Sequence, residues 1–162
     1  MKKTYRKAGR VYKTDEMRLN NEWKRKFKPI LKTIKIPAFL EFLPYGYITR
    51  YIEGIDLQED LPFQPRHDIV RGYPLNEKQR EGVIKIFRDI VFAGLNTGYT
   101  LADFTKRNII LKGDQPYLID YDIIIEGDLP EDYIKIFQKM IDYLELDYQF
   151  DGDLQKLYER IN

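Results

Sequence analysis

The spacing of apolar and polar positions changes from strand-like to helix-like within the first third of this chain. Residues 4–13 mix aromatic and polar side chains around Gly9, which predicts a short β-hairpin. Residues 15–34 then place apolar side chains at helical spacing, with Thr14 as the predicted N-cap and Pro29 as a predicted end or kink. Two more strands are predicted at 36–42 and 45–54.

The rest of the chain also contains segments with strand-like spacing and segments with helix-like spacing of apolar residues. Residues 55–75 hold three prolines and predict a connecting loop with a short helical turn. An amphipathic helix is predicted from Asn76 to the end signal at Asn96–Gly98. Strands are predicted at 108–112 and 116–121 around a "GDQ" turn, with a third at 122–125. Helices after Pro130 and from Asp153 close a chain that should form one folding unit.

The amino-acid composition limits which cross-links and metal sites the protein can form. The chain has 162 residues, no cysteine and one histidine, His67, which we expect to be a loop residue. A disulfide or a zinc–thiolate site is excluded, so a bound metal would need oxygen ligands. Because the apolar runs are far shorter than the roughly 20 residues that a membrane helix needs, we expect a cytoplasmic protein without membrane insertion.

The net charge of +1 hides a strong asymmetry. Residues 1–35 hold 13 Lys or Arg against three acidic residues, and the remainder of the chain is acidic. The basic part could bind nucleotide phosphates or nucleic acid, with Tyr5, Tyr12 and Trp23 interleaved among the cations. It could equally face the acidic remainder of the chain or be a solvated surface.

Three polar residues stand in a pattern that phosphoryl transfer uses. Asp103 and Asn108 are five positions apart, and Asp120 follows directly after the predicted hairpin of 109–119. One aspartate can take the proton of an acceptor hydroxyl, while an asparagine and a second aspartate bind Mg²⁺ through oxygen atoms. The alternative is that Asp103 and Asn108 cap turns, but a buried Asp120 without a partner would be costly.

The stretches "ADFTKRN" and "YLIDYD" resemble the catalytic loop and the metal-binding motif of the protein-kinase-like superfamily. The resemblance is closest to small atypical members: the lipopolysaccharide-core sugar kinases, the kinase of the KEOPS complex and the RIO kinases. It implies Asp103 as catalytic base and Asn108 and Asp120 as metal ligands. Leu101 replaces the family's catalytic-loop histidine, and Asp122, a further metal ligand or a strand-edge charge, replaces its glycine.

The resemblance extends upstream of this motif. "GRVYK" is similar to the strand with the phosphate-binding lysine, which implies Lys13, with Glu22 as its carboxylate partner; Lys7 or Arg10 could replace the former and Glu16 the latter. "YITRYIEGIDL" resembles the strand and hinge of the adenine pocket. It implies Thr49 as gatekeeper and backbone hydrogen bonds from Arg50 and Ile52. In the catalytic loop, Lys106 and Arg107 could steady the γ-phosphate or an anionic acceptor.

The resemblance implies an α+β fold, a minimal two-lobed kinase-like domain over 1–162. Residues 1–53 would form a reduced N-lobe, because no complete glycine-rich loop fits before Lys13, and 54–162 a reduced helical C-lobe. The implied activity is ATP- and Mg²⁺-dependent phosphotransfer to a small molecule, a sugar, a nucleic acid or a specific protein hydroxyl. The alternative is a pseudokinase-like module that binds a nucleotide or a protein partner without phosphotransfer.

Overall fold

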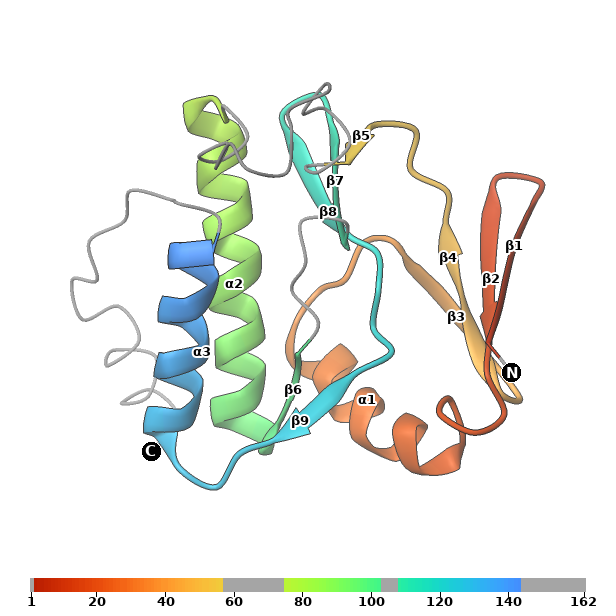
Figure 1. Cartoon of the computed structure of the whole chain (residues 1–162), viewed down its shortest axis with the longest axis horizontal. Helices are drawn as coiled ribbons and strands as arrows, with labels where there is room; N and C mark the ends of the chain where they lie inside the picture. Colours follow the sequence, from red (N-terminus) through yellow and green to blue (C-terminus); the bar gives the residue numbers. More distant parts are fainter. Residues whose placement is uncertain (1, 57–74, 103–107, 144–162) are drawn as a thin grey trace, which may run out of the picture.

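The computed structural model describes residues 2–56, 75–102 and 108–143, which form a mixed α+β structure (Figure 1). The N-terminal part is a four-stranded antiparallel sheet in the order β1-β2-β4-β3. Its strands are β1 (Lys3–Lys7), β2 (Arg10–Thr14), β3 (Phe39–Leu43) and β4 (Gly46–Arg50). Helix α1 (Asn21–Thr33) connects β2 to β3 and packs on one face of this sheet.

The β1–β2 hairpin predicted around Gly9 is confirmed. Its two-residue turn places Ala8 at φ 51° and Gly9 at φ 73°, the left-handed pair that such a turn requires. A second glycine matters for the sheet itself. A Cβ atom at Gly46 would lie 1.9 Å from the carbonyl oxygen of Lys13, so only glycine lets β4 approach β2 at this point.

Helix α1 begins later than the sequence predicted, so the assignment of Thr14 as N-cap is wrong. The side chain of Asp15 accepts the amides of Met17 and Arg18 and closes a turn at 15–18, which keeps this stretch out of the helix. Asn20 is the N-cap instead. Pro29 does not end the helix, which continues to Thr33 because Ile30 is fully buried in the core.

Helix α2 (Glu77–Thr97) confirms the long amphipathic helix. Asn76 and Gln79 form a capping box at its start, and Gly98 ends it in the left-handed conformation with φ 80°. Helix α3 (Pro130–Tyr143) confirms the helix after Pro130 and runs beside α2 (Figure 1). The Tyr133 ring of α3 packs over Gly94, where a Cβ atom would lie 2.3 Å from it.

Two small sheets complete the described part. Strands β5 (Ile55–Asp56), β7 (Ile109–Lys112) and β8 (Gln115–Leu118) form one, and β6 (Tyr99–Leu101) and β9 (Ile124–Glu126) form the other. The predicted strand 116–121 thus ends at Leu118, and the predicted strand 122–125 begins two residues late, because residues 119–123 cross from one small sheet to the other. His67 and the predicted helix from Asp153 lie outside the described residues.

One apolar core joins the four-stranded sheet to the helices and small sheets. Its largest fully buried side chains come from the segment before α1, α1, β4, α2, β6, β7, the 119–123 crossing and α3: Leu19, Phe27, Ile30, Tyr47, Phe87, Ile90, Leu101, Ile109, Leu111, Tyr121 and Phe137. The core positions the 119–123 crossing beneath the sheet. Within the part of the chain that the structure describes, no helix has an apolar stretch long enough to cross a membrane.

Candidate functional site

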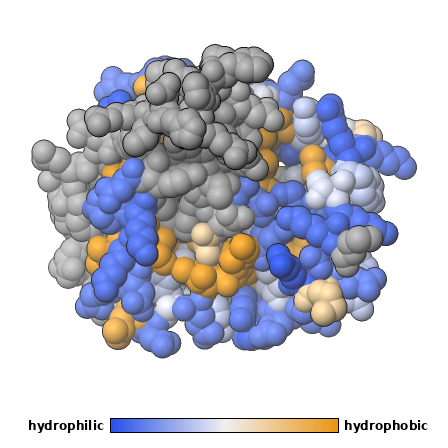
Figure 2. Space-filling view, in the orientation of Figure 1, coloured by the Kyte–Doolittle hydropathy of each residue, from blue (hydrophilic) through white to orange (hydrophobic). Residues whose placement is uncertain are grey.

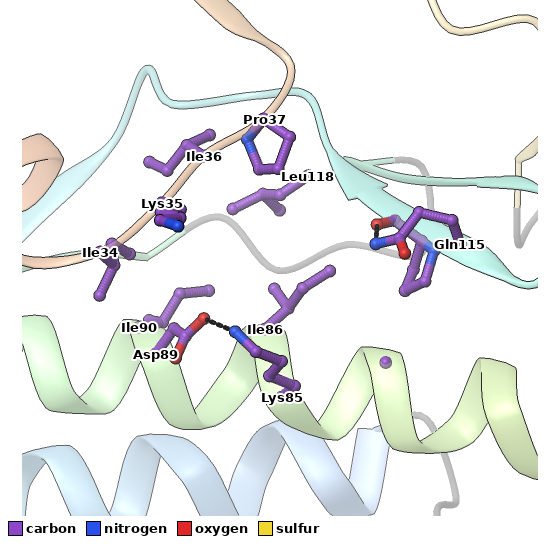
Figure 3. A pocket seen from close by; sticks show the side chains of 12 residues that line it. Ile34, Lys35, Ile36, Pro37, Lys85, Ile86, Asp89, Ile90, Gln115 and Leu118 are labelled. Carbon is purple, nitrogen blue, oxygen red and sulfur yellow. Dashed lines mark hydrogen bonds and ion pairs between the residues drawn. The ribbon is translucent and has the colours of Figure 1, made fainter.

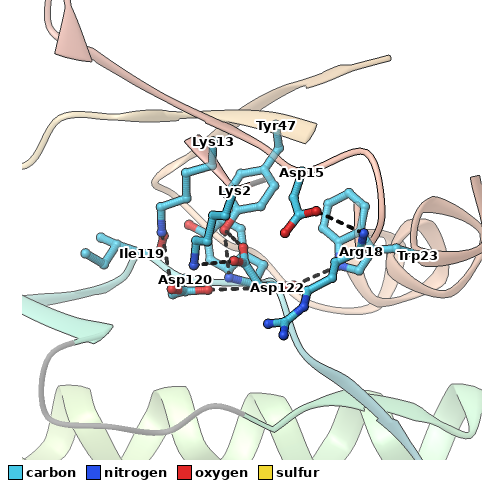
Figure 4. Close-up of polar contacts among 10 residues, drawn as sticks. Lys2, Lys13, Asp15, Arg18, Trp23, Tyr47, Ile119, Asp120 and Asp122 are labelled. Carbon is cyan, nitrogen blue, oxygen red and sulfur yellow. Dashed lines mark hydrogen bonds and ion pairs between the residues drawn. The ribbon is translucent and has the colours of Figure 1, made fainter. Parts of the chain in front are cut away.

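Lys13 is a buried cation on the inner face of the four-stranded sheet. It is 8% exposed and lies opposite Tyr47 in the β2–β4 register, on the side that faces the core. Its Nζ donates a hydrogen bond to the carbonyl oxygen of Ile119 at 3.0 Å and lies 3.4 Å from Asp120 Oδ2. In Figure 4 the Lys13 side chain points toward the segment that carries Asp120. Strand β2 thus meets the 119–123 crossing through the charged contact of Lys13 with Asp120.

The backbone around Asp120 is fixed on both sides of the carboxylate. Asp120 Oδ1 accepts the amide of Asp122 at 3.1 Å, and Trp23 Nε1 donates to the carbonyl oxygen of Tyr121 at 2.9 Å. The hydroxyl of Tyr47 accepts the amide of Tyr121 at 3.1 Å. These bonds hold the Asp120 side chain, which is 14% exposed, in one orientation toward Lys13.

Asn108 reaches this site through the β7–β8 hairpin. The two strands pair Ile109 with Leu118, and the next hydrogen bond in line runs from the amide of Ile119 to the carbonyl oxygen of Asn108 at 3.0 Å. Asn108 therefore lies beside Ile119, one residue before Asp120, and is 7% exposed. The hairpin brings these two predicted ligands to the same end, as its register requires.

Asp122 is the second carboxylate of the crossing and is already partnered. Its Oδ2 lies 2.7 Å from Lys2 Nζ, and its Oδ1 accepts the Tyr47 hydroxyl at 2.6 Å. Burial opposes ionisation, but the bonds from Lys2 and Tyr47, together with the charge of Lys13, outweigh it and lower the pKa of Asp122 below its ordinary value. Of its two predicted roles, these contacts favour a charge that ties the crossing to the sheet and the N-terminus.

Two tyrosines form the apolar wall of the site. The Tyr47 and Tyr121 rings lie 5.1 Å apart between centroids, and both side chains are fully buried. Burial is the main cause that raises the pKa of both hydroxyls, and the negative charge of Asp120 adds to it. Both hydroxyls therefore stay protonated, and Tyr47 serves as a fixed donor to Asp122.

Glu22 lies away from Lys13. Its carboxylate is 3.6 Å from Lys26 on the exposed side of α1, and its side chain is 68% exposed. Because the helix turns Trp23 into the core, the neighbouring Glu22 faces outward. The ion pair that the resemblance implied is absent among the described contacts, where Asp120 takes that place. Glu16 is exposed as well.

The residues predicted to contact an adenine base lie along and after β4. Thr49 and Ile52 are 2% and 5% exposed, whereas the Arg50 side chain is exposed. The amide of Arg50 donates to the carbonyl oxygen of Ala38 at 2.7 Å. Because this amide is already used, an adenine base would have to form hydrogen bonds with other backbone groups of residues 49–52. Asp103, Lys106 and Arg107 lie outside the described residues.

The buried partners of the site give little signal in the sequence. Lys2 is one of many cations in the basic N-terminal segment, and nothing around Tyr47 or Tyr121 marks a polar role. Trp23 does not form an exposed nucleic-acid contact with Tyr5 and Tyr12, because it is 5% exposed and its indole nitrogen donates to the carbonyl oxygen of Tyr121. The helical spacing of Trp23 with Phe27 and Ile30 was the available signal that its ring belongs to the core.

A separate recess of about 290 Å³ lies between α2, β8 and the connection from α1 to β3. Figure 3 shows Ile36, Pro37 and Leu118 around it, with the Lys85–Asp89 ion pair of α2 also on its lining. Its lining includes neither Lys13 nor Asp120. The recess is apolar in character and does not belong to the charged site.

The donor set beside Lys13 suits a hard cation. Among the described residues, no group of three or more His, Cys, Asp or Glu side chains could hold a metal ion. Mg²⁺ nevertheless needs few protein ligands, because it keeps several waters and is bound through one or two carboxylates plus the phosphates of its substrate. Asp120 and Asn108 lie on adjoining segments of the β7–β8 hairpin and the crossing, and a carboxylate and an amide oxygen are the donor types that such an ion takes.

Comparison of the chain with models of known protein families found no match, and comparison with curated proteins found no significant relative. The observations that bear on function are thus the residues and contacts themselves. Chief among them are the buried Lys13–Asp120 contact and the position of Asn108 at the open end of the β7–β8 hairpin.

Proposed function

We propose that this protein is an atypical kinase that transfers phosphate from ATP to a hydroxyl group. The observation that carries the proposal is the contact between Lys13 and Asp120, two largely buried charges from distant parts of the chain that meet at 3.4 Å. A cation on a sheet strand and a carboxylate after a hairpin are the two groups with which kinases hold nucleotide phosphates and metal. The minimal two-lobed kinase-like fold is part of the same proposal.

Each residue has a chemical task in this proposal. Lys13 donates to the phosphate oxygens of ATP and holds them against the inner face of the sheet. Asn108 and Asp120 would hold Mg²⁺, which supplies neutralisation of phosphate charge when bound. Asp103 accepts the proton of the acceptor hydroxyl as its oxygen bonds to the γ-phosphorus and the bond to the β,γ-bridging oxygen breaks, releasing ADP.

The surroundings of Lys13 support this task. An ammonium group with 10% of its side chain exposed is costly unless it is paired, and here it is held by one carbonyl and one carboxylate. An incoming phosphate could exchange for the 3.4 Å contact with Asp120 without moving the bond to Ile119. The acceptor is a small molecule, a sugar, a nucleic acid or a specific protein.

A second function is favoured by the same contact. Lys13 and Asp120 satisfy each other without a ligand, which suits a pseudokinase-like module that binds a nucleotide or a protein without phosphotransfer. Nucleotide-dependent stabilisation with no turnover would distinguish this module from the enzyme.

The test compares wild type with Lys13→Met and the control Lys112→Met, which removes an exposed cation of β7. Melting temperature and release of phosphate from ATP are measured with ATP, Mg²⁺ and both. Loss of a hydrogen bond to a charged group costs about 1.5–3 kcal/mol, so Lys13→Met should weaken ATP binding by roughly tenfold or more. Equal ATP responses in the two variants would contradict the role of Lys13.

A further inference from the structure

The face of the four-stranded sheet opposite Lys13 carries an ordered set of cations. Strand pairing places Lys7 opposite Arg10 and Arg10 opposite Arg50, so three positive side chains form one row across β1, β2 and β4. Two residues along, Tyr5 lies opposite Tyr12, and Lys3 follows on β1. Because side chains alternate between faces, all these residues share one surface, named here the outer face.

The cation row is not explained by the stability of the sheet. Like charges directly opposite each other on neighbouring strands destabilise a sheet. Only Arg10 of the row has an ion pair to another described residue, a 3.3 Å contact with Glu41 in which both side chains are about half exposed. Lys7 and Arg50 are exposed and have no ion pair within the described part of the chain. Such a row suits an anionic partner.

The neighbouring row supplies exposed aromatic surface. The Tyr5 and Tyr12 rings stack at 4.9 Å between centroids with only 2° between their planes, and Tyr5 is 52% exposed. The right-hand surface in Figure 2, which carries the β1–β2 hairpin, is mostly blue to white, as expected for charged groups and tyrosine. An exposed ring beside a row of cations is the combination that binds a base and its phosphates together.

We propose that the outer face binds single-stranded nucleic acid. The phosphates lie along Lys7, Arg10 and Arg50, and a base stacks on the exposed ring of Tyr5. Lys3, two residues beyond Tyr5 on β1, contacts a further phosphate. A single strand fits better than a duplex because its unstacked bases can reach an aromatic ring on a sheet surface. This face is separate from the nucleotide site, since Lys13 projects from the opposite side of β2.

The charges set a quantitative expectation. For single strands, the logarithm of the binding constant falls with the logarithm of salt concentration with a slope of about −0.7 per neutralised phosphate. Four cations on the outer face therefore predict a slope of about −3. Removing two of them should bring the slope to about −1.4 and weaken binding at low salt by roughly tenfold or more.

The experiment measures anisotropy of a fluorescein-labelled 12-nucleotide oligothymidylate with the full chain over a range of salt concentrations. The variant Lys7→Gln/Arg50→Gln should show the weaker binding and lower slope. Its control, Lys78→Gln/Lys112→Gln, removes two exposed cations elsewhere and should stay within about twofold of wild type. Tyr5→Ala should weaken binding by about tenfold at an unchanged slope, and Tyr5→Phe should not. Melting temperatures confirm that every variant is folded.

Four results would overturn the proposal. The first is no binding of the oligonucleotide by wild type. The second is an equal loss of binding in both double variants, which would show a response to net charge alone. The third is a 12-base-pair duplex bound as tightly as the single strand. The fourth is binding to phosphatidylserine vesicles without binding to the oligonucleotide, which would assign the outer face to a membrane surface. None of these results bears on ATP binding at Lys13.

Discussion

Removal of one buried hydroxyl should loosen the candidate site while leaving its shape intact. The Tyr47 hydroxyl donates to Asp122 at 2.6 Å and accepts the amide of Tyr121 at 3.1 Å, and its ring is fully buried. Tyr47→Phe keeps the ring and its contacts with Trp23 and Tyr121. The substitution thus isolates the two hydrogen bonds through which β4 holds the 119–123 crossing.

The magnitude follows from those two bonds. A hydrogen bond to a charged group contributes about 1.5–3 kcal/mol, and an amide left buried without a partner costs about 1–3 kcal/mol. Asp122 keeps its ion pair with Lys2, so losing the hydrogen bond from Tyr47 should cost an amount near the lower end of the range of about 1.5–3 kcal/mol. We expect Tyr47→Phe to lower the free energy of unfolding by about 2.5–4.5 kcal/mol.

Urea unfolding monitored by Trp23 fluorescence measures this loss, since Trp23 stacks on Tyr47. The control is Tyr45→Phe, which removes a hydroxyl from a ring that is 49% exposed and should change stability by less than about 0.5 kcal/mol. A loss below 1 kcal/mol for Tyr47→Phe, or an equal loss in both variants, would refute the argument that these bonds fasten the crossing.

Two further substitutions test other parts of the account. Ala8 has φ 51°, so Ala8→Asn, which creates a favoured Asn-Gly turn, should stabilise the protein by roughly 0.5 kcal/mol in urea unfolding, whereas Ala8→Val should destabilise it; a stabilising valine would contradict the turn geometry. The pKa of Asp122 is lowered in the folded state, so its contribution to stability is present above the unfolded value of about 3.9 and is lost as pH falls through the lower folded value. As the pH falls below about 4, the free energy of unfolding should therefore decrease less in Asp122→Asn than in wild type. The exposed control Asp128→Asn should show the wild-type dependence of this free energy on pH. The same pH dependence in all three proteins would refute the contribution of Asp122.

Local signals predicted the fold where several of them agreed. Helix α2 has an apolar period, a capping box at Asn76 and a left-handed Gly98, and it was located within about a residue. The start of α1 was misplaced because Thr14 and Asn20 are both good N-caps. The choice between them was made by the side chain of Asp15, which closes a turn that the apolar pattern does not reveal.

Sequence reasoning identified Lys13, Asn108 and Asp120 as candidate site residues, but not the buried tyrosines that hold the site. The proximity of Asn108 and Asp120 could be predicted, because a β-hairpin brings the outer ends of its two strands together. The partner of Lys13 could not be predicted. The sequence offered Glu22 or Glu16, but the rotation of α1, which the burial of Trp23 sets, turns Glu22 outward and leaves Asp120 beside Lys13. Tyr47 and Tyr121 were missed because a buried tyrosine shows its polar partner only in three dimensions.

The most direct test of the proposed kinase site is the affinity for ATP with and without Mg²⁺, measured by titration calorimetry. Wild type is compared with Asp120→Asn and with Asp128→Asn, an exposed acidic residue outside the site. We predict that Mg²⁺ tightens ATP binding in wild type and Asp128→Asn, and that Asp120→Asn loses this effect of Mg²⁺ while it remains folded. ATP binding that responds to Mg²⁺ equally in all three proteins, or no ATP binding by wild type, would contradict the assignment of Asp120 as the metal ligand.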